Sequence, residues 1–162
     1  MSDKQTEWTH LDAEGRLRMV DVSDKEASAR EARAEAVIHL SPETLKRIND
    51  RVMPKGNVYE AARLAGVMAA KKTWDIIPLC HPIQITGVDV DFSSDEDASK
   101  IRITSRVRTL DRTGVEMEAL AAAAVAALTI YDMCKAIDRG MTVESVRLLH
   151  KSGGRSGTYD RE

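Results

Sequence analysis

The feature that most constrains this chain is an alanine-rich segment over residues 119–127, in which seven of the nine residues are alanine. It lies within the run TGVEMEALAAAAVAALTIYDMCKAIDRG, residues 113–140. Alanine has the highest intrinsic helix propensity, so we expect a helix here. Its small side chains add little apolar bulk, and a helix of this kind depends on packing against a partner. The segment therefore predicts a helix whose backbone lies unusually close to the elements that cover it.

Charged residues border this helix at both ends. Glu116 and Glu118 stand at its start, and Asp132 and Lys135 stand near its end. Residues three apart on a helix are neighbours, so Asp132 and Lys135 are expected to form a pair. Such a pair is usually a weak surface salt bridge. Its apolar neighbours favour partial burial instead, and cations nearby would lower the pKa of the lysine until it could exchange protons.

The length of the helix separates the two charged ends. Glu118 and Asp132 are fourteen residues apart, which corresponds to roughly 21 Å along a helix axis. Both ends cannot touch one small reacting centre. The spacing predicts either a long ligand or a site that takes one end from each of two copies of the chain, and we favour the shared site.

Composition narrows the class of protein. A chain of 162 residues fits one domain with a real core, and aromatic residues at 4% leave a thin core that favours oligomerisation. With 24 basic and 26 acidic residues, the charge balance points to neither nucleic acid nor a membrane surface. The N-terminal sequence lacks a secretory pattern, and the uncharged run over 119–131 is shorter than the roughly 20 residues of a membrane span. We predict a cytoplasmic protein with reduced thiols at Cys80 and Cys134.

The order of predicted elements indicates an α+β fold. We expect a flexible segment over residues 1–15, a single domain over 16–151 and a flexible glycine-rich tail over 152–162. Strands are expected at 16–22, 31–40, 83–92, 100–110 and 142–149. Helices are expected at 42–51, at 58–75 and through the alanine run, which Glu116 enters and Lys135 leaves. From residue 31 onward the main elements follow the ferredoxin-like split βαβ, an antiparallel sheet with its helices packed on one face. Arg102, Arg106 and Arg108 fall on the open face, as solvated surface or as a subunit contact.

Two loops carry candidate site residues. Lys55 comes just before a helix capped by Asn57, and a helix N-terminus favours an anion. This lysine would bind phosphate or act as an acid or base, or it is an ordinary turn lysine. In Leu79-Cys80-His81 the neighbouring thiol and imidazole suggest a metal, but no second Cys/His pair has ligand spacing, so we predict no metal site. His81 either handles a proton or ligand, or is a packed loop histidine.

Two further candidates concern carboxylates and cations. Glu116 and Glu118 either complement the helix dipole or hold a donor-rich ring such as guanine. The segment from Lys151 to Gly157 contains two cations and three glycines, but it lacks the spacing of a Walker A motif. It is either a flap that closes over a polyphosphate, with Lys151 and Arg155 as its cations, or a disordered tail.

Taken together, these segments resemble the cyclic pyranopterin monophosphate synthases, the C proteins of molybdenum-cofactor biosynthesis. The resemblance covers about residues 19–159. Its most specific segments are AAKKTWDIIPLCHPI (69–83), TGVEMEALAAAAVAALTIYDMCKA (113–136) and VRLLHKSGGRSG (146–157). Asn57, His150 and Arg155 depart from the residues usual in the family.

The resemblance implies a lyase that converts 3′,8-cyclo-7,8-dihydro-GTP into cyclic pyranopterin monophosphate and releases diphosphate. It also implies a ferredoxin-like homohexamer, a trimer of dimers with active sites at the dimer interfaces. Asp132, Lys135 and Lys55 match catalytic positions. The matching substrate-binding positions are Leu79, Cys80, His81, Glu116, Met117, Glu118 and Lys151. No cofactor is required by the sequence, and a divalent cation carried by the triphosphate stays open. The alternatives are a non-catalytic nucleotide-sensing module and a purely structural oligomerisation domain.

Overall fold

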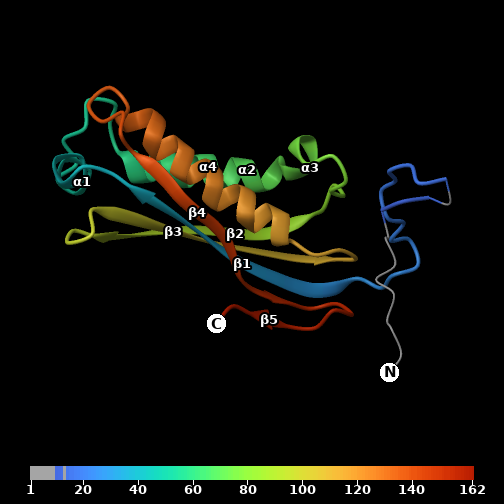
Figure 1. Cartoon of the computed structure of the whole chain (residues 1–162). Coiled ribbons are helices and arrows are strands. Elements are labelled where there is room, and N and C mark those ends of the chain that lie inside the picture. Colours follow the sequence, from blue (N-terminus) through green and yellow to red (C-terminus); the bar gives the residue numbers. More distant parts are fainter. Residues whose placement is uncertain (1–9, 13) are drawn as a thin grey trace.

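The structure, a computed structural model, describes residues 10–12 and 14–162. It consists of one five-stranded sheet with the helices on one of its faces (Figure 1). The elements in chain order are β1 (Ser28–His39), α1 (Pro42–Asn49), α2 (Val58–Lys71), α3 (Thr73–Ile76), β2 (Ile85–Asp95), β3 (Lys100–Asp111), α4 (Glu116–Cys134), β4 (Thr142–Ser152) and β5 (Tyr159–Asp160).

The sheet has the strand order β2-β3-β1-β4-β5, and every neighbouring pair is antiparallel. The first four strands reproduce the split βαβ arrangement, in which β1 and β3 occupy the centre. Helices α2 and α4 pack against each other and onto this sheet. The predicted α+β fold, with an antiparallel sheet and its helices on one face, is confirmed.

The alternation expected along the first main strand is also confirmed. Ala32, Ala34, Ala36 and Ile38 of β1 are fully buried beneath the helices. Their neighbours along the strand point to the opposite face, because successive side chains of a strand alternate. The core above β1 is built of small aliphatic groups, as the composition predicts.

Helix α4 lies as close to its neighbours as its alanines require. A Cβ placed on Gly66 of α2 would come within 3.0 Å of the Ala122 carbonyl oxygen and 3.1 Å of Val90 Cγ2. On the sheet side, the buried Ser105 hydroxyl donates to the Ala119 carbonyl at 2.6 Å. The helix therefore touches α2 and β3 almost backbone to backbone, as the alanine run predicts.

The apolar character of α4 is explained by this packing. The helix Glu116–Cys134 is long and apolar enough to cross a membrane by length and composition, yet it packs against α2, β1, β3 and β4. Ala119, Ala122, Ala126 and Ile130 are among its fully buried residues. The core helix of a soluble protein meets the same criterion.

Both predicted helix caps are present, but one helix is shorter than expected. Ser41 accepts from the Thr44 amide and Asn57 accepts from the Glu60 amide, each at 3.3 Å. The helix expected over 58–75 is divided, because Lys72 leaves the helical region with φ −114° and ψ 10°. The one-turn helix α3 follows before Pro78.

The strand expected over 16–22 is wrong. The backbone there forms a single isolated bridge between Leu11 and Leu17. Asp12 accepts from the Arg16 amide at 2.8 Å, and Gly15 adopts φ +77°, so the chain makes a tight turn in place of a strand. At the other end of the chain, the predicted tail over 152–162 contains the short strand β5, paired with β4.

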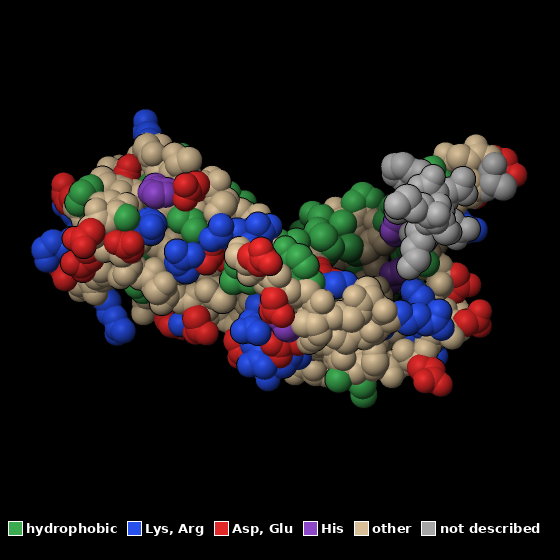
Figure 2. All heavy atoms as spheres, turned by 60° about the horizontal axis from the view of Figure 1, so that its bottom comes forward, with side chains coloured by type: hydrophobic (Ala, Val, Ile, Leu, Met, Phe, Trp, Pro, Cys, Tyr) green, Lys and Arg blue, Asp and Glu red, His purple; other side chains and the backbone are tan. Residues whose placement is uncertain are grey.

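The open face of the sheet carries a network of ion pairs. Glu35, only 3% exposed, binds both Arg102 and Arg147, the latter at 2.7 Å. Arg106 pairs with Glu31 at 2.5 Å. From the side opposite the helices, cationic and acidic side chains are interspersed (Figure 2). The arginines predicted on this face are therefore charge-compensated within the chain.

Candidate functional site

The three residues with predicted catalytic roles meet at the C-terminal end of α4. The Lys135 ammonium lies 2.7 Å from Asp132 Oδ1, and the Lys55 ammonium lies 3.3 Å from Asp132 Oδ2. Lys55 also donates to the Asp132 carbonyl at 2.8 Å. One carboxylate thus holds two ammonium groups that come from separate parts of the sequence.

The local fold explains how Lys55 arrives there. It occupies the tight turn between α1 and α2, in which the Gly56 amide donates to the Met53 carbonyl at 3.0 Å. Gly56 has φ +95°, a backbone conformation that favours glycine. The Ser41 amide, at the start of α1, donates to Asp138 Oδ2 at 2.8 Å. This bond ties the α1 end of the molecule to the segment after α4, so the turn faces Asp132.

Two expectations about this cluster are wrong for the protomer. The side chains of Asp132 and Lys135 are 58% and 54% exposed, so the predicted partial burial is not found within one chain. The pKa of Lys135 is raised, not lowered, because its ammonium donates a hydrogen bond to Asp132. The same bond, together with that from Lys55, holds the pKa of the Asp132 carboxyl below its usual range. Within one chain, the attraction of the Asp132 carboxylate has a larger effect on the pKa of Lys135 than any repulsion from the Lys55 ammonium.

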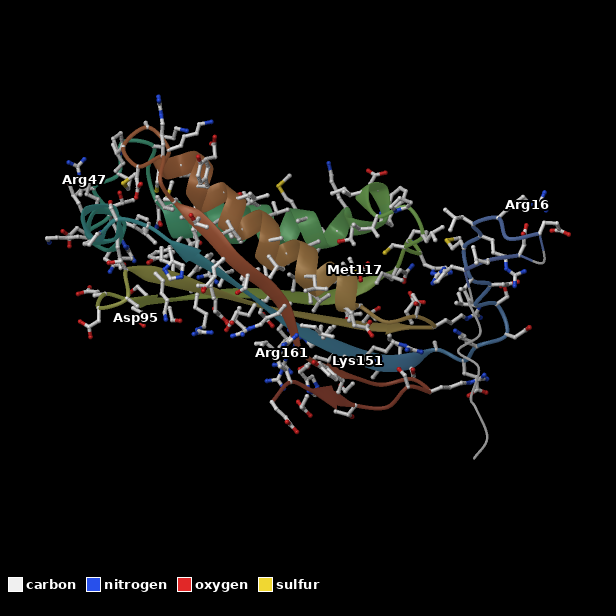
Figure 3. All side chains as sticks on the ribbon, viewed as in Figure 1. Arg16, Arg47, Asp95, Met117, Lys151 and Arg161 are labelled. Carbon is white, nitrogen blue, oxygen red and sulfur yellow. The ribbon has the colours of Figure 1, made fainter. Side chains whose placement is uncertain are left out.

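The predicted substrate-binding residues meet at the opposite end of α4. A cavity of about 430 Å³ is lined there by the loop after α3 and by the first turn of α4. The predicted residues among its lining are Leu79, Cys80, His81, Glu116, Met117 and Glu118. Met117 lies at this end of the helix, near Lys151, while Arg47 of α1 marks the far end of the molecule (Figure 3).

Glu118 is the most perturbed acid of this cavity. Its residue is 3% exposed. Burial raises the pKa of the carboxyl to about 7, and the nearby charge of Glu116 adds to the rise. Burial also raises the pKa of the Cys80 thiol, with a contribution from the charge of Glu118. A carboxyl that titrates near neutral pH can either donate a hydrogen bond to a ring or accept one.

His81 and Lys151 are held by specific partners. His81 Nε2 lies 2.7 Å from the Val20 carbonyl oxygen, and this contact holds the ring on the wall of the cavity. Lys151 of β4 lies 3.3 Å from Glu116 and donates to the Ser156 hydroxyl at 2.7 Å. Lys151 therefore connects the first turn of α4 to the glycine-rich loop after β4.

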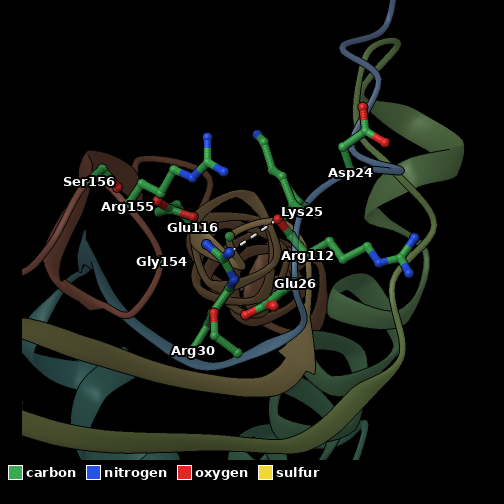
Figure 4. A pocket seen from close by; sticks show the side chains of 12 residues that line it. Asp24, Lys25, Glu26, Arg30, Arg112, Glu116, Gly154, Arg155 and Ser156 are labelled. Atoms are coloured by element: carbon green, nitrogen blue, oxygen red, sulfur yellow. Dashed lines mark hydrogen bonds between the residues drawn. The ribbon is translucent and has the colours of Figure 1, made fainter.

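A second and larger cavity, of about 630 Å³, adjoins the first through Lys25 and Glu116. Figure 4 shows Arg30 and Arg155 on its lining, with Lys25 and Arg112 nearby. Asp24, Glu26 and Glu116 also line this cavity, so its four cations exceed its acids by one, and that excess suits an anionic ligand. Among these four, the sequence predicts contact with an anion only for Arg155.

The remaining three cations could not be placed from sequence patterns. Arg30 donates to the Asp111 carbonyl at 2.9 Å and to the Arg112 carbonyl at 3.1 Å. These bonds depend on the register that pairs Ser28 with Asp111. The signal that could have placed Arg30 is the start of β1 at Ser28. With that start, the pairing of Ser28 with Asp111 brings Arg30 to the end of β3.

The structure thus brings the predicted residues together in two groups, and it keeps the groups apart. Lys55, Asp132 and Lys135 lie at one end of α4, and the remaining seven lie at the other. Because α4 is continuous from Glu116 to Cys134, Glu118 and Asp132 are about 21 Å apart along its axis. No group of three or more His, Cys, Asp or Glu within residues 10–12 and 14–162 could hold a metal ion.

Comparison with known proteins gives one consistent result. The MoaC family matches residues 19–154 of the chain. Relatives named cyclic pyranopterin monophosphate synthase are similar over nearly all of the chain. One from Pelotomaculum thermopropionicum is 56% identical over 154 residues, 95% of this chain and 91% of the relative. One from Desulfatibacillum aliphaticivorans is 54% identical over 156 residues, 96% and 98% of the two chains. One from a Thermoanaerobacter species is 57% identical over 154 residues, 95% and 98%.

Proposed function

The chain belongs to the MoaC family, and from this premise we propose the reaction that its site performs. It converts 3′,8-cyclo-7,8-dihydro-GTP into cyclic pyranopterin monophosphate and releases diphosphate, as a lyase of molybdenum-cofactor biosynthesis. The observation that carries the proposal is the convergence of Lys55 and Lys135 on the two oxygens of Asp132. Two ammonium groups on one carboxylate form a compact set of proton donors and acceptors.

The proposed reaction requires several proton transfers. The imidazole part of the guanine opens by hydrolysis, and the ring closes again as a pterin. A hydroxyl oxygen of the substrate then attacks the α-phosphorus and loses its proton, and the bond from that phosphorus to the bridging oxygen breaks, so a cyclic ester forms as diphosphate leaves. Each step moves a proton to or from nitrogen or oxygen, and a positioned side chain speeds such a transfer by about 10²–10⁴-fold. Lys135 and Lys55 donate and accept these protons. Asp132 orients both lysines and sets the charge of Lys135.

The residues at the N-terminal end of α4 bind the substrate. Glu116 and Glu118 hold the base, whose ring N–H and amino group match carboxylates. Met117 and the Leu79-Cys80 segment line the same cavity. His81, Lys151 and Arg155 bind the anionic part, supported by the other cations of the larger cavity.

A dimer joins the two groups of residues into one site. Met117, Ala121, Ala124, Leu128 and Asp132 follow one stripe of α4, and Met117, Leu128 and Asp132 are exposed on it. In an antiparallel pair of α4 helices whose two-fold axis passes beside residues 124 and 125, positions 117 and 132 lie equally far from the axis, about 11 Å along the helix. Residue 117 of one copy then faces position 132 of the other.

This pairing supports the proposal of a shared site. It brings the cavity of one copy to the lysine cluster of the other, and its two-fold symmetry gives two such sites in each dimer. We extend it to a homohexamer, a trimer of dimers. The exposed Leu64 and Met68 of α2 provide further apolar surface beside α4 for subunit contacts.

Complementation between inactive variants tests the sharing. Lys135→Ala and Glu116→Ala are each expected to abolish turnover. When the two are refolded together, mixed dimers hold one intact site, so activity returns to about a quarter of that of the unaltered protein if the chains pair at random. Sedimentation of the unaltered protein reports the hexamer. If mixing restores no activity while the chains exchange, each site belongs to a single chain.

Loss of Lys135 tests the reaction itself. Lys135→Ala is expected to reduce diphosphate release from the cyclised substrate by roughly 10³-fold or more, with folding and assembly retained. Lys46→Ala is the matched control, since Lys46 also forms an exposed helical ion pair, with Asp50 at 2.6 Å. Normal rates in the Lys135 variant would refute its role. An unaltered protein that binds the substrate but releases no diphosphate would be a nucleotide-sensing module.

Two further predictions accompany the proposal. A divalent cation would arrive with the phosphates of the substrate, because Mg²⁺ commonly binds through substrate phosphates and few protein carboxylates. Omitting the metal from an assay with metal-free substrate measures that dependence. We also propose that the enzyme is cytoplasmic, and the free thiols of Cys80 and Cys134 support a reducing compartment; cell fractionation measures this directly.

A further inference from the structure

The glycine-rich loop after β4 forms part of the larger cavity wall. Gly154, Arg155 and Ser156 line this cavity, and Ser156 accepts the hydrogen bond from Lys151 at 2.7 Å. Gly153 and Gly154 have φ of +92° and +73°. A Cβ on Gly154 would collide with the guanidinium group of Arg30, so the loop passes directly against that side chain.

The far end of this loop is fixed by the strand β5. His150 pairs with Asp160 and Lys151 with Tyr159 in the ladder between β4 and β5. Just beyond the strand, the Arg161 amide donates to the Leu149 carbonyl at 2.9 Å, and its Nε donates to the Leu148 carbonyl at 3.0 Å. The loop is therefore closed as a hairpin, with both of its ends on β4.

A side-chain pair locks this hairpin. His150 Nδ1 lies 2.7 Å from Asp160 Oδ1, and the histidine side chain is only 15% exposed. His150 is one of the residues at which this chain departs from those usual in the family it resembles. Its sequence neighbour Lys151 reaches both Glu116 and Ser156. The lock therefore lies one residue away from a side chain of the site.

We propose that His150 and Asp160 are positioning residues that hold the loop of residues 153–157 over the larger cavity, so that Arg155 and Ser156 meet the anionic part of the substrate. The proposal rests on the proposed function for the identity of that anion. Neither residue reaches the cavity wall itself, so their effect passes through the hairpin. They act on substrate binding and not on the proton transfers at the lysine cluster.

Asp160→Asn tests the lock, because it removes the charge and preserves the shape of the side chain. Glu162→Gln is the matched control, since it removes the same charge from the same tail two residues further on. The first measurement, without substrate, is the rate of tryptic cleavage after Arg155, followed by mass spectrometry. An exposed ion pair contributes up to about a 5-fold change in an equilibrium, so we expect cleavage about 3–5-fold faster in Asp160→Asn and unchanged in the control.

The second measurement is steady-state kinetics with the cyclised substrate. We expect KM to rise about 3–5-fold in Asp160→Asn with kcat unchanged, because the loop loses a restraint while the lysine cluster stays intact. Asp160→Glu keeps the charge and is expected to restore both values. A chain that ends at Thr158 also loses the hydrogen bonds of β5, and its KM should rise by about 10-fold or more.

The outcomes distinguish failure of the His150–Asp160 proposal from failure of the proposed function. Equal cleavage rates and equal KM values for Asp160→Asn and Glu162→Gln, together with an unaffected truncated chain, would overturn the proposal. Faster cleavage with an unchanged KM would also overturn it, because the loop would then be restrained without contacting substrate. Absence of diphosphate release from the unaltered protein contradicts the proposed function instead, and the cleavage assay still reports the lock.

Discussion

Replacing Glu118 by Gln should make the protein more stable at pH 8 but not at pH 4. Burial raises the pKa of this carboxyl in the folded chain to about 7, from the ordinary value of 4.5 for an exposed glutamate. The folded state therefore binds this proton more tightly than the unfolded state. The contribution of the protonated Glu118 carboxyl to stability is fully present below the unfolded pKa. It is lost as pH rises towards the folded pKa, where Glu118 ionises inside the fold. Gln is neutral at every pH and escapes this penalty.

The size of the gain in stability follows from the rise of the Glu118 pKa from 4.5 to about 7. Each pH unit of pKa displacement corresponds to about 1.4 kcal/mol, which sets an upper bound of about 3.5 kcal/mol. Because the carboxyl lines an open cavity, water relieves part of this penalty, and we expect about 2 kcal/mol. In a chain of this length that raises Tm by roughly 4–8 °C.

Thermal unfolding of the assembled protein at pH 4, 6 and 8 measures the difference. The matched control is Glu116→Gln on the same turn of α4, which loses an ion pair with Lys151 and should show slightly lower stability at pH 6 and 8. A Tm difference between Glu118→Gln and the unaltered protein that is the same at pH 4 and pH 8 would refute the reasoning. The variant should also lose affinity for the substrate, since the amide carries no negative charge.

Three further substitutions test other parts of the structure. Glu35→Gln should destabilise the fold by about 1–3 kcal/mol, measured by urea unfolding at pH 7. Two arginines hold the pKa of the buried Glu35 low against the opposing effect of burial, so the difference should shrink as pH falls through that lowered pKa; an equal difference in strong acid would contradict this. Gly66→Leu should lower stability by about 3 kcal/mol, because its side chain meets the Ala122 backbone; an unchanged Tm would show that α2 and α4 can separate without cost. Asp132→Asn should lower turnover by about 10²-fold or more with Tm unchanged, and unimpaired diphosphate release would remove Asp132 from the mechanism.

The fold could be predicted well because its signals are local. Alternation in β1, the caps at Ser41 and Asn57 and the alanine run of α4 each depend on residues close in sequence. The segment over 16–22 misled because its apolar residues alternate by chance, while Asp12 and Gly15 form a turn that outweighs the pattern. A segment with a weak strand pattern forms a strand only where the edge of a sheet lies beside it and offers hydrogen-bond partners.

The candidate site was predictable only in part, because its assembly is non-local. Lys55 and Asp132 are 77 positions apart and meet only through the packing of α2 on α4. The role of Arg30 depends on the β1–β3 register, which the sequence pattern does not specify. Burial of the lysine cluster was predicted from apolar neighbours, but Cys134, Tyr131 and Met133 pack into or against the core and Ile137 is itself exposed, so none of them covers the charged groups.

The alanines of α4 also limit where this protein can move. An alanine side chain has no torsion angle that exchanges rotamers, so the contact of α4 with α2 and the sheet has few alternative packings. The helix is therefore rigid, and it fixes the distance between the lysine cluster at one end and the cavity at the other. Any adjustment to a ligand has to come from the three loops around it, at residues 53–56, 79–81 and 153–157, or from a shift of one whole subunit against another.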